Sequence, residues 1–236
     1  MAKVESADGY LEWFCRTSSD DCERFSVAVL AAHPDDEIIG AGVQLSKLER
    51  VTVIYITDGA PRNLNDAKTA GFESAEEYAS ARRSEAVAAL ALCDVVPPQI
   101  LCLNVADQEA SHNLRLISRS IAPLLDGNDI VLTHPYEGGH PDHDAAAFCA
   151  RASVSLLQRA RRRLPKAIIE FTSYHARGDG VELGRFRPNG RVVRTRHLTL
   201  EEQASKREMF ARHATQRRIL DSFPVFAESF RLAPHY

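Results

Sequence analysis

The feature that most constrains the fold is the alternation of short apolar, β-branched runs with longer stretches of helical periodicity. Five short runs predict strands, at Val27–Ala32, Val51–Thr57, Ile100–Asn104, Ile130–Thr133 and Ala167–Thr172. Five longer stretches predict helices, at Glu37–Leu48, Ala75–Leu92, Leu114–Leu125, Asp142–Arg163 and Leu200–Leu220. Strands and helices that alternate in this way are typically joined by right-handed crossovers, with helices on both faces of a parallel sheet. The sequence therefore predicts an α/β fold with three layers around a mostly parallel sheet.

Two segments depart from this alternation. The connection from Asp58 to Ser74 is polar and long for a crossover, which predicts a lid or a substrate-binding loop. The stretch from Ser173 to His197 is rich in Gly and Arg and contains short β-like pieces such as Arg191–Thr195, which predicts a hairpin or an irregular excursion. The chain has 236 residues, 44% of them hydrophobic, which is enough for one sizeable core. We therefore expect residues 1–236 to form a single domain.

The charge balance and the absence of long apolar runs limit the partners. The 29 basic residues face 32 acidic ones, so the net charge of −3 argues against nucleic acid or an anionic membrane as a partner. No window approaches the roughly 20 apolar residues that a membrane span needs, and the amino terminus lacks a basic flank followed by an apolar stretch. We expect a soluble, cytoplasmic protein.

The cysteines support the same compartment. Their number is odd and no CxxC pair occurs among them: Cys15, Cys22, Cys93, Cys102 and Cys149. This pattern favours reduced thiols over a disulfide framework or a thiolate zinc site.

Two His-Pro-Asp segments carry the strongest functional signal. AHPDDE (residues 32–37) ends the first predicted strand, HPDH (residues 140–143) comes after the fourth, and each opens a predicted helix. Ligands of open α/β sheets bind beyond the carboxyl ends of the strands. We therefore expect the two segments to meet in one crevice.

The residue types in these segments point to a metal. His33 and Asp36 are three residues apart where a strand turns into a helix, so both side chains can reach one ion, and His143 supplies a third ligand from the other wall. Two imidazoles and one carboxylate leave a coordination position open, which is typical of catalytic rather than structural zinc sites. The same ligands also suit other divalent ions, Fe²⁺ among them.

The remaining acidic and imidazole groups suit hydrolysis. Zinc lowers the pKa of a bound water from about 15.7 towards about 7. Asp35, between the two ligands of the first segment, is then placed to act as general base and to pass the proton to a leaving amine. His140 is placed to stabilise an oxyanion or to protonate the leaving group.

Either segment alone has a simpler interpretation, because a His-Pro pair after a strand is more often a turn than a metal site. Two acid-rich copies, each after a strand and before a helix, are hard to explain by turn chemistry. Buried clusters of Asp and His are also costly unless they are paired or bind a metal. The pair of segments therefore favours a metal site.

Longer stretches of the sequence resemble a known family. AHPDDEIIGAG, VTVIYITDGA and THPYEGGHPDHDA resemble the zinc-dependent PIG-L (LmbE-like) deacetylases, over a region from roughly Val27 to Gln216. Members of that family remove acetyl groups from N-acetylglucosamine-type amines in glycolipids, thiol cofactor precursors, antibiotics and chitobiose. The resemblance implies a Rossmann-like three-layer sandwich. It assigns the zinc to His33, Asp36 and His143. It makes Asp35 the base and His140 the polarising or acid group, as the residue chemistry does.

The resemblance also implies contacts to substrate. The family's Arg-x-x-Glu pattern matches Arg82 and Glu85 on a predicted helix, although the neighbouring Arg83 leaves the register open. Asp107 follows the third predicted strand, where members of the family often contact a substrate hydroxyl.

One position departs from the family pattern. Some members carry a tyrosine two residues before the first histidine of the second motif, whereas this chain has Gly138 there and Tyr136 two residues earlier. Either Tyr136 reaches the site by a different loop path or His140 acts alone. The simpler interpretation of Tyr136 is an ordinary loop aromatic.

Three further residues have two interpretations each. His134 ends the fourth predicted strand and either orients a ligand or caps the strand. His213 and Gln216 lie on the late helix, in a stretch that resembles a family segment packed near the site, and are either outer partners of the site or surface residues.

The sequence thus predicts a metal-dependent N-deacetylase acting on a small amidosugar or glycoconjugate. Two alternatives remain: an amidase or esterase on a non-sugar substrate, and a metal- or sugar-binding module without turnover. The sequence does not fix the substrate, the physiological metal or whether the chain forms a homo-oligomer.

Overall fold

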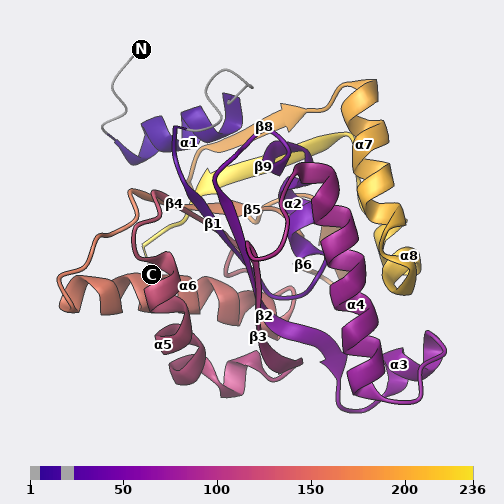
Figure 1. Cartoon of the computed structure of the whole chain (residues 1–236). Helices are drawn as coiled ribbons and strands as arrows, with labels where there is room; N and C mark the ends of the chain where they lie inside the picture. The colour runs from indigo at the N-terminus through magenta and orange to yellow at the C-terminus, as the bar shows by residue number, and fades with distance from the viewer. Residues whose placement is uncertain (1–5, 17–23, 236) are drawn as a thin grey trace.

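A seven-stranded sheet forms the centre of the computed structural model, which describes residues 6–16 and 24–235 (Figure 1). The strand order is β3-β2-β1-β4-β5-β9-β8. The strands are β1 (Val27–Ala31), β2 (Val51–Pro61), β3 (Ile100–Asp107), β4 (Ile130–Thr133), β5 (Ala167–Phe171), β8 (Val193–His197) and β9 (Ala227–Leu232). Strands β1 to β5 pair in parallel, and β9 pairs antiparallel with both β5 and β8. The predicted α/β fold with a mostly parallel sheet is confirmed.

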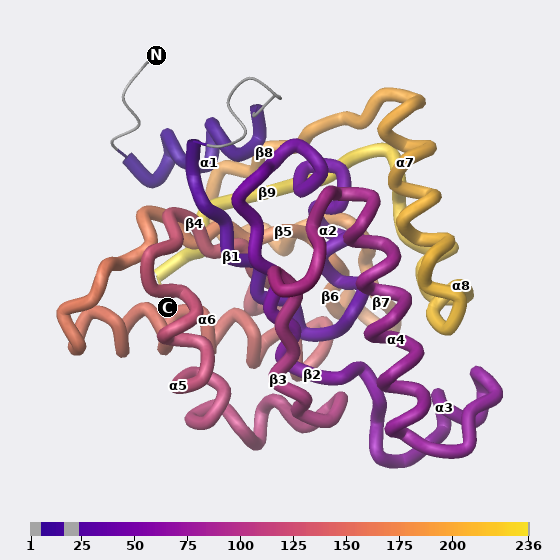
Figure 2. Tube along the Cα trace, viewed as in Figure 1, coloured from indigo at the N-terminus to yellow at the C-terminus, as the bar shows by residue number. Residues whose placement is uncertain are grey.

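Helices cover both faces of this sheet (Figures 1 and 2). They are α1 (Ala7–Arg16), α2 (Asp36–Leu45), α3 (Asn65–Thr69), α4 (Ala75–Leu90), α5 (Leu114–Leu125), α6 (Pro141–Arg159), α7 (Leu200–Ala211) and α8 (Arg217–Leu220). Successive strand side chains point to opposite faces, so Val27 and Val29 pack into one core with α1, α2, α4 and α7, whereas Ala28 and Leu30 pack into another with α5 and α6. The sheet is therefore the middle of three layers.

The topology places the two His-Pro-Asp segments side by side. Strands β1 and β4 are neighbours in the sheet. The helix after β1, α2, lies on one face, and the helix after β4, α6, lies on the other. Chains that leave adjacent strands in opposite directions open a crevice at the carboxyl ends of those strands. This crevice is where the sequence places the functional residues.

Two predicted strands extend further than expected. β2 continues to Pro61, because its register against β3 shifts between Thr57 and Pro61. Gly59, with φ +70°, accommodates this shift in the backbone. The start of the predicted connection, at Asp58 and Gly59, is therefore a bulge within the strand. β3 continues to Asp107, which brings that residue to the end of the strand.

Four predicted helices end earlier than expected, and the difference is largest in the last two. The helix predicted over Asp142–Arg163 ends at Arg159, shortly before Arg161 adopts φ +53°. The helix predicted over Leu200–Leu220 ends at Ala211 and is followed by a 3₁₀ turn, η4 (Ala214–Gln216), and by α8. The side chain of Glu85 accepts a hydrogen bond from the Thr215 amide, which removes that amide from a helical ladder.

The Gly- and Arg-rich stretch contains the predicted hairpin, formed by β6 (Tyr174–Arg177) and β7 (Gly180–Leu183). Its last part, β8, is not irregular, because it forms the edge of the central sheet. The connection predicted as a lid or substrate loop holds the end of β2 and the short helix α3.

A buried ion pair joins α2, α7 and β9. Lys206 Nζ lies 2.8 Å from Glu228 Oε1, and neither side chain is exposed to solvent. Lys206 also donates to the Ile39 carbonyl of α2, while Glu228 accepts hydrogen bonds from the amides of Val43 and Gln44. The ion pair is thus attached to the middle and the end of α2, the helix that follows the first His-Pro-Asp segment.

The thiols and the helices bear on two further expectations. Cys15, Cys93, Cys102 and Cys149 are free, while Cys22 and the first five residues lie outside the described part of the chain. Within residues 6–16 and 24–235, no helix is both long and apolar enough to cross a bilayer.

Candidate active site

The two His-Pro-Asp segments form one wall of a cavity of about 780 Å³ at the carboxyl end of the sheet. All the site residues predicted from the sequence line it except Tyr136: His33, Asp35, Asp36, Arg82, Asp107, His140 and His143. The other wall, the outer wall of the cavity, comes from α3, from η4 and from α8. The fold therefore gathers residues that lie more than 100 positions apart into one site.

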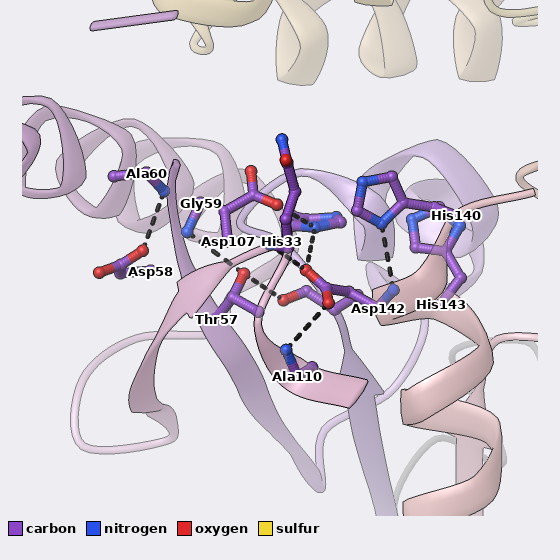
Figure 3. Close-up of polar contacts among 12 residues, drawn as sticks. His33, Thr57, Asp58, Gly59, Ala60, Asp107, Ala110, His140, Asp142 and His143 are labelled. Atoms are coloured by element: carbon purple, nitrogen blue, oxygen red, sulfur yellow. Dashed lines mark hydrogen bonds and ion pairs between the residues drawn. The ribbon is translucent and has the colours of Figure 1, made fainter. Parts of the chain in front are cut away.

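His33 lies at the centre of a group of carboxylates (Figure 3). Its Nδ1 is 3.2 Å from Asp36 Oδ2, and its Nε2 is 3.1 Å from Asp107 Oδ1 and 3.3 Å from Asp142 Oδ2. Burial disfavours a charged ring, but the surrounding carboxylates outweigh burial and raise the pKa of His33 well above its ordinary value. Both ring nitrogens of His33 thus face negative charge.

Asp36 and His143 form the second part of the cluster. His143 Nε2 lies 3.3 Å from Asp36 Oδ1, yet it is buried without a hydrogen-bond partner in the described part of the chain. Burial, assisted by the nearby His134, lowers the pKa of His143 to about 4, so the ring is neutral near pH 7. A neutral, buried imidazole nitrogen without a hydrogen-bond partner has the chemistry of a metal ligand.

His134 has both of the functions that the sequence left open. Its Nε2 accepts a hydrogen bond from the Ala32 amide at the end of β1 and lies 3.3 Å from Asp36 Oδ2. Its ring stacks on that of His143, with centroids 4.1 Å apart. His134 therefore ties the end of β4 to β1 and packs against His143, one of the expected metal ligands.

Donor atoms converge in three overlapping groups among the described residues: His33, His140 and His143; Asp36, His134 and His143; and His33, Asp107, His140 and Asp142. The three expected ligands all take part, but none of the groups contains all three. His33 Nδ1 lies 3.2 Å from the Asp36 carboxylate, and each of these two residues shares one of the groups with His143. The mixture of imidazole and carboxylate donors, with the unpartnered His143 nitrogen, fits a divalent ion.

Asp35 faces the same cavity from a strained backbone. Its φ of +154° with ψ of −23° is a conformation that side-chain-bearing residues rarely adopt. Arg82 donates to its Oδ2 at 2.8 Å. Burial raises the pKa of Asp35 to about 7, and Arg82 opposes this rise. Arg83, the alternative arginine for the Arg-x-x-Glu pattern, instead donates to the exposed Asn104.

His140 is the first residue of the second motif and caps α6. Its Nδ1 accepts a hydrogen bond from the Asp142 amide, and its ring lies edge-on to that of His33. Because Nδ1 accepts, a neutral His140 carries its proton on Nε2, which is then a donor. Burial lowers the pKa of His140 to about 4, so the neutral form prevails at pH 7.

Asp142 was missed by the sequence reasoning. It is fully buried, accepts hydrogen bonds from the amides of Gln108 and Ala110, and lies against His33 (Figure 3). It therefore fixes the turn after β3 and holds Asp107 at the edge of the cavity. Its position inside HPDH was the available signal, since an acid in the first turn of a helix often binds nearby amides.

The tyrosine that lines the cavity near the second motif is Tyr174 and not Tyr136. The structure does not bring Tyr136 into the cavity, because its side chain is 56% exposed and is not part of the lining. Gly138 has φ +72°, a conformation that disfavours a tyrosine there. Tyr174, at the start of β6, lines the cavity instead, with its ring 5.0 Å from that of His143. No sequence signal pointed to Tyr174.

One face of α4 holds the outer wall of the cavity. Tyr78 accepts a hydrogen bond from the Gln216 side chain, and Glu85 accepts from the amide and the hydroxyl of Thr215. Gln216 and Thr215 line the cavity. His213 is fully buried and is not part of the lining, so it packs behind the wall rather than on the surface.

A family model agrees with this arrangement. The model described as PIG-L, GlcNAc-PI de-N-acetylase, matches residues 28–154, a region that contains both His-Pro-Asp segments. No curated protein sequence gives a significant match.

Solved structures resemble the whole chain. A deacetylase mutant involved in teicoplanin biosynthesis has a TM-score of 0.66 and 18% identity, over 88% of this chain and 97% of its own. The N,N'-diacetylchitobiose deacetylase of Pyrococcus horikoshii has a TM-score of 0.63 and 19% identity, over 99% and 95%. GalB of Pseudomonas putida, a 4-carboxy-2-hydroxymuconate hydratase, has a TM-score of 0.63 and 15% identity, over 90% and 97%. At these identities the likeness establishes the fold, and the hydratase shows that this fold hosts more than one chemistry.

Proposed function

Because the chain belongs to the GlcNAc-PI de-N-acetylase (PIG-L) family, we propose that it is a hydrolase that removes an acetyl group from the amide nitrogen of an N-acetylglucosamine-type sugar or a related small conjugate. The observation that carries this proposal is the juxtaposition, in one cavity, of the His33, Asp36 and His143 donors with the carboxylate of Asp35. Solved deacetylases of the same fold support the reaction class.

In this proposal His33, Asp36 and His143 hold a divalent ion, with Zn²⁺ preferred by the donor set and Fe²⁺ as the alternative. When bound, such an ion polarises the amide carbonyl and makes water more acidic. A cation held by these three residues would lower the pKa of Asp35, as Arg82 does.

The residues of the chain divide the proton transfers between them. Asp35 accepts a proton from the attacking water and delivers it to the amine nitrogen as the C–N bond breaks. His140 stabilises the negative charge that develops on the carbonyl oxygen, since its neutral ring carries a donor at Nε2. Tyr174 is a second candidate donor, because its ring lies beside His143 in the cavity.

Asp107 is the proposed contact for a sugar hydroxyl. One of its oxygens bonds to His33 and the residue lines the cavity, so the carboxylate bridges the cluster and the substrate space. The outer wall from α3 and α8 borders the rest of the substrate and would select the group attached to the sugar.

Acetate release tests the proposed function. Purified protein supplied with Zn²⁺ or Fe²⁺ is expected to release acetate from at least one member of a panel of acetamido sugars and their glycoconjugates. A second panel contains simple amides, esters and an unsaturated dicarboxylic acid. Turnover of an ester or a non-sugar amide alone would favour the amidase or esterase alternative. Hydration of the unsaturated acid alone would place the chain with the hydratase.

Metal binding gives an independent test of the cluster. His143→Ala is expected to lower the affinity for Zn²⁺ by more than the about 10- to 100-fold that loss of an outer partner costs. The measurement is metal content after dialysis, together with calorimetric titration of the metal. His197→Ala is the matched control, because His197 is exposed on the edge strand β8. Equal metal content in the two variants would contradict the proposed site.

A further inference from the structure

Arg82 lines the cavity, but its hydrogen bonds go to the loop that follows β1 and to β2. We propose that Arg82 is a positioning residue that holds the Asp35 carboxylate towards the reacting atoms, and not a contact for a substrate hydroxyl. The proposal rests on the proposed function, in which Asp35 transfers the proton. It differs from the expectation drawn from the sequence, where Arg82 was a substrate-binding residue.

The hydrogen bonds of Arg82 are directed into the protein. One terminal nitrogen donates to Asp35 Oδ2 at 2.8 Å and to the Pro34 carbonyl at 3.2 Å. The other donates to the Gly59 carbonyl at 2.7 Å. Arg82 is only 4% exposed, although its neighbour Arg83 reaches the surface. The guanidinium thus clamps the loop after β1 to the bulge in β2.

The conformation of Asp35 explains why a clamp is needed. A residue with φ of +154° and ψ of −23° persists only where its surroundings fix it. Arg82 binds the carbonyl immediately before Asp35 and the carboxylate of Asp35 itself. It engages Oδ2, and no described residue donates a hydrogen bond to Oδ1, which therefore remains for the proton in transfer.

Gly59 shows that the site is shaped around the guanidinium. A Cβ atom added at this position would lie 2.4 Å from a terminal nitrogen of Arg82. Its φ of +70° also disfavours any side chain there. The bulge in β2 therefore brings a bare backbone carbonyl to Arg82.

The helix that carries Arg82 is itself anchored. Tyr78 and Glu85 lie on the same face of α4, four residues before and three residues after Arg82. Both residues bind the outer wall of the cavity, through Gln216 and Thr215. Arg82 is therefore presented from a helix that is tied down on both sides.

The test compares Arg82→Gln, Arg82→Lys and the matched control Arg83→Gln. Arg82→Gln is expected to lower kcat by about 100-fold, as a misplacement of about 1 Å can do, with KM within about threefold of the unchanged protein. The kcat of Arg82→Lys is expected to lie between those of Arg82→Gln and the unchanged protein, because lysine keeps the charge but cannot make all three contacts. Arg83→Gln is expected to leave both constants unchanged. Adding guanidinium ions to Arg82→Ala is expected to restore part of kcat, which a merely structural role would not allow.

Two readouts do not depend on turnover. Metal content is expected to be the same in all variants, and a crystal structure of Arg82→Gln is expected to show the Asp35 carboxylate turned from its position. A rise in KM with unchanged kcat, or an Asp35 that keeps its position without Arg82, would overturn the proposal. Lack of activity in the unchanged protein would count against the proposed function instead, and the crystal structure would still decide the role of Arg82.

Discussion

Asparagine in place of Asp35 is expected to lower the rate of amide hydrolysis by about 10²- to 10⁴-fold, the usual contribution of a general acid–base group. Asparagine has the same shape and keeps an oxygen for the hydrogen bond from Arg82. It cannot accept a proton at neutral pH, so the transfer from water to the leaving nitrogen loses its carrier. Metal content is expected to stay at the level of the unchanged protein, since Asp35 is not among the proposed ligands.

Initial rates of acetate release and bound metal are measured on the same preparations of Asp35→Asn. The matched control is Asp8→Asn, which alters an exposed carboxylate on α1 that does not line the cavity. A rate within a few-fold of the unchanged protein would exclude Asp35 as the base. Loss of the metal would instead place Asp35 among the ligands.

The second large effect is expected on stability. Lys206→Met should lower the free energy of unfolding by about 3–5 kcal/mol, the usual cost of removing one partner of a buried ion pair. The substitution leaves the Glu228 carboxylate at 0% side-chain exposure, and within residues 6–16 and 24–235 its remaining hydrogen-bond partners are the amides of Val43 and Gln44. It also removes the donor to the Ile39 carbonyl.

Urea denaturation measures this loss. The double variant Lys206→Met with Glu228→Gln is expected to be more stable than Lys206→Met alone, because it no longer buries an unpaired charge. Lys47→Met is the control, since the Lys47–Glu202 pair is partly exposed and its removal is expected to cost less than about 1 kcal/mol. If Lys206→Met were as stable as Lys47→Met, the buried pair would contribute nothing.

The parallel half of the sheet could be predicted because its strands are apolar on both faces. Val27–Ala31 and Ile130–Thr133 are entirely buried, so their residues form unbroken apolar runs that alternate with helices. The location of the site followed from the same pattern, since both His-Pro-Asp segments come after strands that the topology makes neighbours. Local sequence and global fold agree in this part of the chain.

Strand β9 could not be predicted because two of its four buried positions are charged. Glu228 pairs with Lys206, and Arg231 binds both Glu170 and Glu137, so all of these side chains are buried in ion pairs. Such a segment has the composition of a surface loop until its distant partners are known. Helix α1 was likewise absent from the sequence prediction, since it packs against strands from the far end of the chain.

The missed parts of the site have the same origin. Tyr174 reaches His143 only because the second motif passes close to the hairpin, where a Cβ on Gly139 would lie 2.2 Å from the Tyr174 carbonyl oxygen. Thr215 and Gln216 line the cavity because α7 ends at Ala211 and the Thr215 amide donates a hydrogen bond to the Glu85 side chain. These contacts join distant segments, and nothing in the local pattern around them indicates which partner each will find.

The shared face of α4 has a consequence for how such a pocket can be altered. Tyr78 and Glu85 hold the outer wall, while Arg82 between them holds Asp35. Exchanging residues 214–219 for those of a relative, in order to accept a different sugar conjugate, therefore disturbs the helix that aims Asp35 unless positions 78 and 85 are exchanged as well. Substrate specificity and the rate of turnover therefore depend on the same helix. Exchanging the outer wall alone should yield a protein that binds its new substrate but turns it over slowly.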